Sequence, residues 1–359
     1  MFLAWHEIKY DKRKFLLIMI IIALIAWLVY VLTGLATGLG DGNRKAIDQW
    51  QADGIILSSE ANKSLTASRL DMADLENIHV PIKEPIGQSL YTVKRKGQKE
   101  NSRQNAAVFG ILSDSFLKPD TLSGRSFHNK NEAVIASDFK QFNYKLGDEL
   151  LLGSSHTPIK VVGFFEKSTY NLAPVIYLSL DTWQTLTFNR IPKKDNLISG
   201  IVYQKKNSDL HLNQASRYDH LSLEAFIQKI PGYSEQKLTL DGMIYFLFVI
   251  ATFVIGVFIY VITLQKQKLF GILKVQGIPT RLLATSVLWQ TFLLSSLGIV
   301  LGMILTFITS YFLPESLPFA IDFKKNGVYS LILLLSTLIG GAFSLKSVIK
   351  INPLKAIGG

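Results

Sequence analysis

Four long uncharged runs interrupt a sequence that otherwise mixes polar and apolar residues. Runs of more than about 18 mostly apolar residues are typical of transmembrane helices, because a helix of that length crosses the hydrocarbon core of a bilayer. The pattern therefore predicts four spans, of which the first is separated from the other three. The runs are Phe15–Leu39, Gly242–Leu264, Leu282–Pro314 and Asn326–Leu345.

Between the first two runs, short β-like segments alternate with turns and a few helices, without the regular strand–helix repeat of a nucleotide-binding sheet. This predicts an α+β domain inserted between helices 1 and 2 of a four-helix membrane protein, with a solvated hairpin tip at the basic segment Lys94–Arg103. The expected strands are Gly54–Leu57, Leu90–Val93, Ala106–Ile111, Ala133–Ala136, Glu149–Leu152, Ile159–Phe164, Val175–Leu178 and Gly200–Tyr203. The expected helices are Leu70–Asn77, Asp181–Phe188 and Ser222–Lys229.

The pattern also predicts where each part of the chain begins and ends. In order, we expect an N-terminus with helix 1 (1–41), an extracytoplasmic domain (42–238), helix 2 (239–264), a cytoplasmic segment (265–281), helix 3 (282–314), an extracytoplasmic loop (315–325), helix 4 (326–348) and a C-terminus (349–359).

The segment between the second and third runs is more than a polar connection. Read as a helix, it places Leu269, Ile272 and Leu273 on one face, with Phe270 and Val275 beside them. Its cations Lys266, Lys268 and Lys274 surround this apolar face. The pattern predicts a short amphipathic helix that contacts something outside the bilayer core. The alternative is a helix that lies on lipid headgroups.

Charge changes the picture by giving an orientation. The net charge is +11 and the mean hydropathy +0.26, and cations gather before the first run, between runs two and three, and after the fourth. Because cytoplasmic loops carry an excess of Lys and Arg, both termini and the 265–281 segment are expected in the cytoplasm of a multi-pass cell-membrane protein. The positive charge is then a topology signal, and we expect no nucleic acid partner. A cleaved signal peptide is the alternative for the first run, which is longer than a typical signal-peptide core.

Candidate chemistry is sparse. The sequence has no G-x-x-x-x-G-K-[ST] phosphate loop, no G-x-S-x-G elbow, and six histidines without metal-ligand spacing. The four apolar runs contain no ionisable Asp, Glu, Lys, Arg or His, which ion-coupled transporters usually need at membrane depth. We therefore expect a non-catalytic membrane subunit without a cofactor of its own, whose energy comes from a partner. The lack of cysteine fits an outer domain of the kind found in Gram-positive bacteria.

Several motifs resemble those of the FtsX-like, macrolide-exporter-type permeases of ABC transporters. Residues 269–278 (LFGILKVQGI) are similar to the family's E-x-G-I-L-K-A-x-G segment, with Phe270 at a usually polar position, and residues 351–357 (INPLKAI) resemble its C-terminal ending. The outer domain matches the family's core pattern at Gly124-Arg125, Glu132–Ile135, Leu146–Asp148 and Val161–Gly163.

The resemblance implies a homodimeric permease that works with a cytoplasmic ABC ATPase dimer, which hydrolyses ATP and drives the outer domains by mechanotransmission. Membrane lipid is the other expected partner. The implied ATPase-coupling residues are Lys268, Leu269, Phe270, Ile272, Leu273 and Lys274.

Three further stretches are similar to the haem-efflux permeases of Gram-positive bacteria: residues 2–9 (FLAWHEIK), 47–57 (IDQWQADGIIL) and 170–177 (YNLAPVIY). This resemblance implies haem as the exported substrate, with no metal beyond its iron. Tyrosine and methionine can ligate haem iron, and the candidate substrate residues are Tyr170, Tyr233, Glu235, Met243 and Tyr245. Packing alone, or an aromatic belt at the membrane interface, also accounts for these residues. An exporter of antimicrobial peptide or lipid, and a regulatory protein that transmits ATPase strokes to an extracytoplasmic partner, stay open as alternatives.

Overall fold

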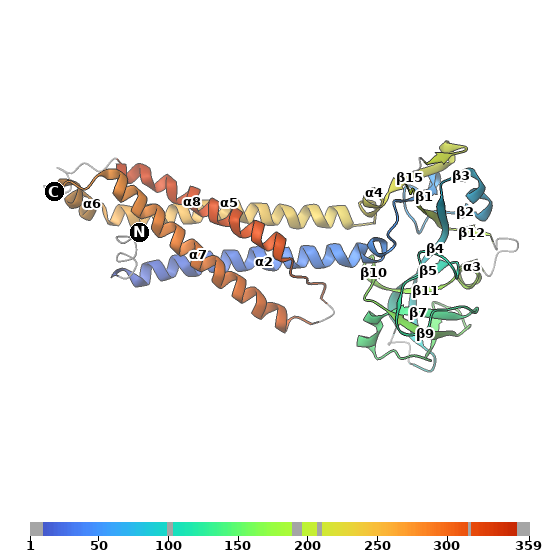
Figure 1. The fold of residues 1–359 in the computed structure, drawn as a ribbon. Helices are drawn as coiled ribbons and strands as arrows, with labels where there is room; N and C mark the ends of the chain where they lie inside the picture. The colour runs from blue at the N-terminus through green and yellow to red at the C-terminus, as the bar shows by residue number, and fades with distance from the viewer. Residues whose placement is uncertain (1–9, 99–102, 189–195, 207–209, 315–316, 350–359) are drawn as a thin grey trace. The chain divides into compact units, whose positions relative to one another are not determined.

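The computed structural model describes residues 10–98, 103–188, 196–206, 210–314 and 317–349 (Figure 1). The chain divides into two compact units. One unit, called here the membrane unit, combines Met1–Gly38 with Lys237–Gly359, and the other, the outer unit, is Leu39–Gln236. These boundaries lie within three residues of the predicted domain 42–238. Residues 1–9 of the predicted N-terminal segment (1–41) and residues 350–359 of the predicted C-terminus (349–359) lie outside the described residues.

Four helices of the described chain are long and apolar enough to cross a membrane. They are α2 (Lys12–Gln49), α5 (Tyr233–Gln265), α7 (Thr280–Phe312) and α8 (Phe323–Ile349). Each corresponds to one of the predicted runs. Helix α2 continues ten residues past its run, α5 begins nine residues before its run, and α7 ends two residues before the end of its run. The short α6 (Gln267–Val275) follows α5 and occupies only part of the predicted 265–281 segment.

Small residues let α2 and α7 approach closely. A Cβ added at Gly298 would lie 2.7 Å from the Ile22 side chain, and one at Gly302 would lie 2.6 Å from Cβ of Ala26. Such contacts drive association in a bilayer, where helices gain little from the hydrophobic effect. The spacing of the two glycines, one helical turn apart, puts both on the face of α7 that α2 covers.

Most strands of the outer unit belong to one eleven-stranded sheet, ordered β10-β11-β7-β9-β8-β4-β13-β1-β15, with β5 between β11 and β4 and β6 beside β9 (Figure 1). Two further pairs, β12-β2 and β14-β3, lie apart from it. The strands are β1 (Gly54–Ser58), β2 (Leu70–Asp71), β3 (Ile78–His79), β4 (Ile82–Arg95), β5 (Gln104–Ile111), β6 (Thr121–Gly124), β7 (Glu132–Ala136), β8 (Glu149–Leu152), β9 (Ile159–Phe165), β10 (Thr169–Tyr170), β11 (Ala173–Ser179), β12 (Leu197–Ile198), β13 (Gly200–Gln204), β14 (His211–Leu212) and β15 (Tyr218–Ser222).

All eight predicted strands are present, and β4 is longer than predicted. Its first half pairs with β13, its second half with β5, and its end with β8. This long strand therefore joins the two halves of the sheet. The structure also contains short strands that carry too few residues to show alternation, such as β10 and β12.

The predicted helix Leu70–Asn77 is wrong in type and start. Leu70 and Asp71 pair with β12, and only Met72–Asn77 is helical, as a 3-10 helix. Asp71 accepts a hydrogen bond from the Ala73 amide at 2.9 Å, and its own amide donates to Asp74 at 2.8 Å, so the two acids cap the helix. The other helices are α3 (Leu180–Phe188) and α4 (Leu223–Ile227), the second shorter than predicted.

Two glycines that are paired across neighbouring strands leave space for a side chain of α3 in the core of the outer unit. Gly87 of β4 and Gly110 of β5 are paired across the ladder, and the buried Trp183 of α3 lies on them. A Cβ at Gly87 would be 2.2 Å from the Trp183 ring, and one at Gly110 would be 2.4 Å from its Cβ. Glycine is required here because the indole occupies the space of both side chains.

Candidate functional site

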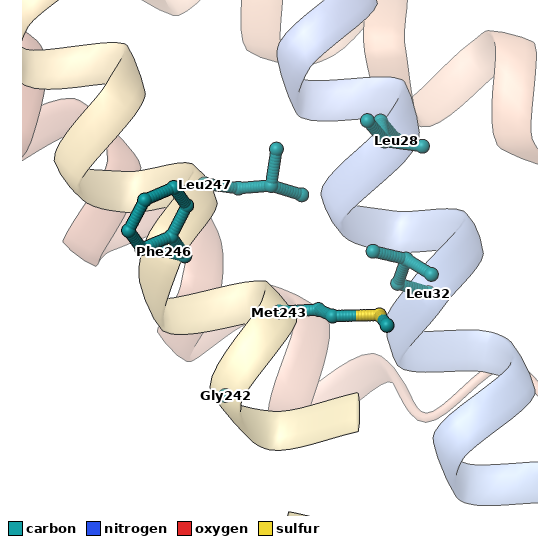
Figure 2. Close-up of a pocket in the computed structure, with 6 residues that line it drawn as sticks. All are labelled: Leu28, Leu32, Gly242, Met243, Phe246 and Leu247. Carbon is teal, nitrogen blue, oxygen red and sulfur yellow. The ribbon is translucent and has the colours of Figure 1, made fainter. Parts of the chain in front are cut away.

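An apolar groove lies between α2 and α5 of the membrane unit. Its volume is about 460 Å³, within the range of small-molecule pockets. Every residue that lines it is apolar (Figure 2): Leu28, Leu32, Gly242, Met243, Phe246 and Leu247. The groove can therefore accept a flat or elongated apolar group, and it offers one polarisable atom, the Met243 sulfur.

Helical spacing explains why these residues share the groove. Leu28 and Leu32 are one turn apart on α2, and Gly242, Met243, Phe246 and Leu247 occupy one face of α5. Figure 2 shows the Met243 side chain extended from α5 toward Leu32. Gly242 has no atom within 4 Å of an added Cβ, so it widens this end of the groove.

Met243 is the predicted substrate residue that the structure places in this groove. Met243 is 50% exposed, so this residue is not enclosed in the core between the helices. Tyr245, two positions along α5, points about 200° away around the helix and does not line the groove. It is 57% exposed, which suits the interfacial role of tyrosine.

Tyr170 does not fit the predicted role of a haem ligand. It is 4% exposed and packs edge-on against Phe109, with ring centroids 5.4 Å apart, in the core of the outer unit. Burial raises the pKa of its phenol, so the phenolate that would bind iron is disfavoured. The prediction is corrected because the sequence motif around Tyr170 forms core strands.

Tyr233 is also a packing residue. It is 6% exposed at the start of α5 and belongs to the core of the outer unit. Its hydroxyl lies at Arg44, whose pKa is raised by hydrogen bonding to Asp48 above all and also by Tyr233 and Glu224. Glu235 is exposed on α5, also in the outer unit, and is not among the groove-lining residues.

The exposed apolar face of the amphipathic helix α6 agrees only in part with the predicted one. Leu269, Ile272 and Val275 are 46%, 45% and 58% exposed, and Lys268 is exposed beside them. Leu273 is partly buried against the hydrophobic core between the helices of the membrane unit, and Lys274 is half-buried. Phe270 is 1% exposed and belongs to that core, so it anchors α6 to its own chain and does not supply the outward contact predicted for it.

The sequence singled out Met243 as a candidate but none of the other residues that line the groove. Leu28, Leu32, Phe246 and Leu247 are ordinary apolar residues within uniformly apolar runs. In such runs every face looks alike, so no periodicity distinguishes a groove from a packed or lipid-facing surface. Only the helix packing singles these residues out.

Taken together, the four spans, the large inserted β-rich domain and the exposed amphipathic helix after the second span define a polytopic membrane subunit. Two family models match it. The MacB-like periplasmic core domain matches residues 15–209, and the FtsX-like permease C-terminal domain matches residues 242–353. The chain belongs to the FtsX-like permeases of ABC transporters with a MacB-like periplasmic core.

Relatives match along the whole length. A Staphylococcus epidermidis protein named "Putative hemin transport system permease protein HrtB" is 30% identical over 360 residues, covering 99% of each chain. The protein with the same name in Staphylococcus haemolyticus is 28% identical over 358 residues, again covering 99% of each. An uncharacterized ABC transporter permease of Mycobacterium tuberculosis is 22% identical over 364 residues, covering 100% of this chain and 99% of its own.

Proposed function

We propose that this chain is the permease of an ATP-driven efflux system for haem, and that haem enters it through the groove between α2 and α5. The observation that carries the proposal is that the half-exposed Met243, whose thioether can bind iron, lines an otherwise aliphatic and aromatic groove. The names of the staphylococcal relatives point to the same substrate.

The chemistry of haem suits this groove. Its porphyrin is a flat apolar ring, its iron accepts a thioether ligand, and its two propionates are anionic. The groove supplies apolar walls and the thioether. Lys237 lies six residues before Met243 on α5, about 9 Å toward the end at which α5 enters the outer unit. With the expected orientation, the ring would lie in the outer leaflet and the propionates would point toward this cation and water.

Transport also requires that affinity change during the cycle. In the proposed mechanism an ATPase dimer docks on the exposed face of α6 in each of two permease copies. ATP-driven closure of the ATPases narrows the groove between α2 and α5 and expels haem outward. A single thioether contact suits this task, because a pump must hold its substrate weakly enough to release it in the second state.

Haem titration of the purified permease tests the substrate. We expect a saturable shift of the Soret band for the wild type. Met243→Leu keeps the apolar volume but removes the sulfur, so it should alter the position of that band and weaken binding at least about tenfold, or about 1.4 kcal/mol. Met303→Leu is the matched control. Met303 lies on α7, packs against the hydrophobic core between the helices of the membrane unit, and does not line the groove.

Two results would count against the proposal. Wild-type-like binding and haem tolerance in Met243→Leu would remove the assigned ligand. The absence of any saturable Soret shift in the wild type would remove haem as the substrate, and an amphipathic peptide or a lipid would then be tested in the same groove.

A further inference from the structure

We propose that Lys266 is a positioning residue for energy coupling. It holds the junction between α5 and α6 against the start of the first span. The inference rests on the proposed docking of the ATPase on α6. It assigns a role to Asp11, Phe15 and Lys266, which the groove and the exposed face of α6 leave unexplained.

The Lys266 side chain is directed at α2. Its Nζ lies 3.8 Å from a carboxylate oxygen of Asp11, and it also lies 4.9 Å from the centroid of the Phe15 ring. The side chain is 11% exposed, and that of Asp11 is 28% exposed. A cation so shielded from water interacts more strongly with an anion and an aromatic face than an exposed pair does.

A second contact lies next to the first. Nζ of Lys14 donates a hydrogen bond to Oε1 of Gln265 at 2.6 Å. Gln265 is the last residue of α5, and Lys14 is in the first turn of α2. The end of α5 and the start of α2 are therefore joined by an ion pair, a cation–π contact and a hydrogen bond, called here the α2–α5 clamp.

The backbone of Lys266 links this clamp to α6. Its amide donates to the carbonyls of Ile262 and Thr263 in the last turn of α5, each at 3.2 Å. Its carbonyl accepts from the Phe270 amide at 2.9 Å in the first turn of α6. The Phe270 side chain is buried in the hydrophobic core between the helices of the membrane unit. A displacement of α6 is therefore transmitted to α5 and, through the clamp, to α2.

Lys266 thus differs in role from its neighbour Lys268, which is exposed on α6 and available to a partner. The clamp makes α6 and the start of α2 move as one body. This arrangement allows one docking helix to act on both helices that border the groove.

A double-mutant cycle on the full-length permease, purified with its ATPase subunit and reconstituted in lipid vesicles, tests this role. The variants are Lys266→Met, Asp11→Asn and both together. We expect each single variant to lower permease-stimulated ATP hydrolysis at least about fivefold, with normal co-purification of the ATPase. The double variant should be no worse than either single one, since both remove the same contact. Lys266→Arg should retain stimulation, and Lys12→Met, at an exposed lysine in the first turn of α2, is the matched control for loss of a lysine.

A crosslink tests the movement directly, because the chain has no native cysteine. Lys14→Cys with Gln265→Cys, joined by a short bismaleimide, should retain stimulated hydrolysis if the clamp stays closed throughout the cycle. Loss of stimulation on crosslinking would overturn the inference, as would additive effects in the cycle or equal effects of Lys266→Met and Lys12→Met. Loss of co-purification in Lys266→Met would instead make Lys266 a direct ATPase contact.

Leu269→Asp separates this inference from the proposal beneath it. The substitution places a carboxylate on the exposed apolar face of α6 and should abolish co-purification. If it does so while Lys266→Met behaves like wild type, the positioning role alone is wrong. If Leu269→Asp binds and stimulates the ATPase like wild type, the docking of α6 fails and the positioning role fails with it.

Discussion

Glu132 carries the clearest stability prediction, because its carboxylate is buried and fully partnered. It is 8% exposed at the start of β7. Arg125 donates to its two oxygens at 2.8 and 2.5 Å, and the amides of His128 and Asn129 donate at 3.1 and 3.2 Å. Arg125 and Glu132 thus join two separate stretches of the outer unit, one before β7 and one at its start.

Glu132→Gln keeps the shape of the side chain but removes the charge and replaces one acceptor with a donor. The Arg125 side chain is 52% exposed, so it is rehydrated when its partner is lost, and the cost comes from the lost hydrogen bonds to the carboxylate. Such a loss costs about 1–3 kcal/mol. We therefore expect the free energy of unfolding of the outer unit to fall by about 2 kcal/mol. In hydrogen exchange of the full-length protein, protection of the amides of β7 should fall about thirtyfold.

The pH dependence follows from the same contacts. Hydrogen bonds from Arg125 hold the pKa of the Glu132 carboxyl well below its usual range. Because the folded pKa is depressed, the stabilisation is fully present above the unfolded pKa of about 4.3 and is lost as the pH falls below it. Wild-type protection in β7 should decline in acid with a steeper slope than that of Glu132→Gln.

Glu149→Gln is the control, because the Lys96–Glu149 pair is 57% and 45% exposed and should contribute less than about 1 kcal/mol. Equal losses in the two variants, or a Glu132→Gln variant with unchanged protection and pH slope, would refute the reasoning.

Two further predictions concern the topology of the chain and the packing of its membrane helices. With the expected orientation, a cysteine replacing Lys96 should react with a membrane-impermeant thiol reagent in whole cells and one replacing Lys268 should not; the reverse labelling would overturn the topology. Gly302→Leu should lower the free energy of unfolding of the full-length protein, measured in detergent, by about 1–3 kcal/mol, because an added Cβ would lie only 2.6 Å from Cβ of Ala26. Gly327→Leu on α8 has open space and should change stability little, so equal losses would show that the α2–α7 contact is not the cause.

The spans, the inserted domain and most of its strands could be predicted from the sequence because each depends on a local pattern. A bilayer imposes a minimum apolar length, and a strand buried on both faces appears as a short apolar run between turn residues. The helix predicted at Leu70–Asn77 failed because Leu70 and Asp71 pair with β12, more than 120 residues away in the chain, and this pairing outweighs the local preference.

The sequence by itself thus determined the number of spans, the site of the insertion, the amphipathic helix after the second span and the family motifs. Tertiary structure decided which apolar or aromatic residues remain accessible. It buried Tyr170, Tyr233 and Phe270, left Met243 open beside Leu32, and turned Lys266 toward Asp11. The reason is physical. Burial and pairing depend on which surfaces of distant segments meet, and in uniformly apolar helices no local pattern records that choice.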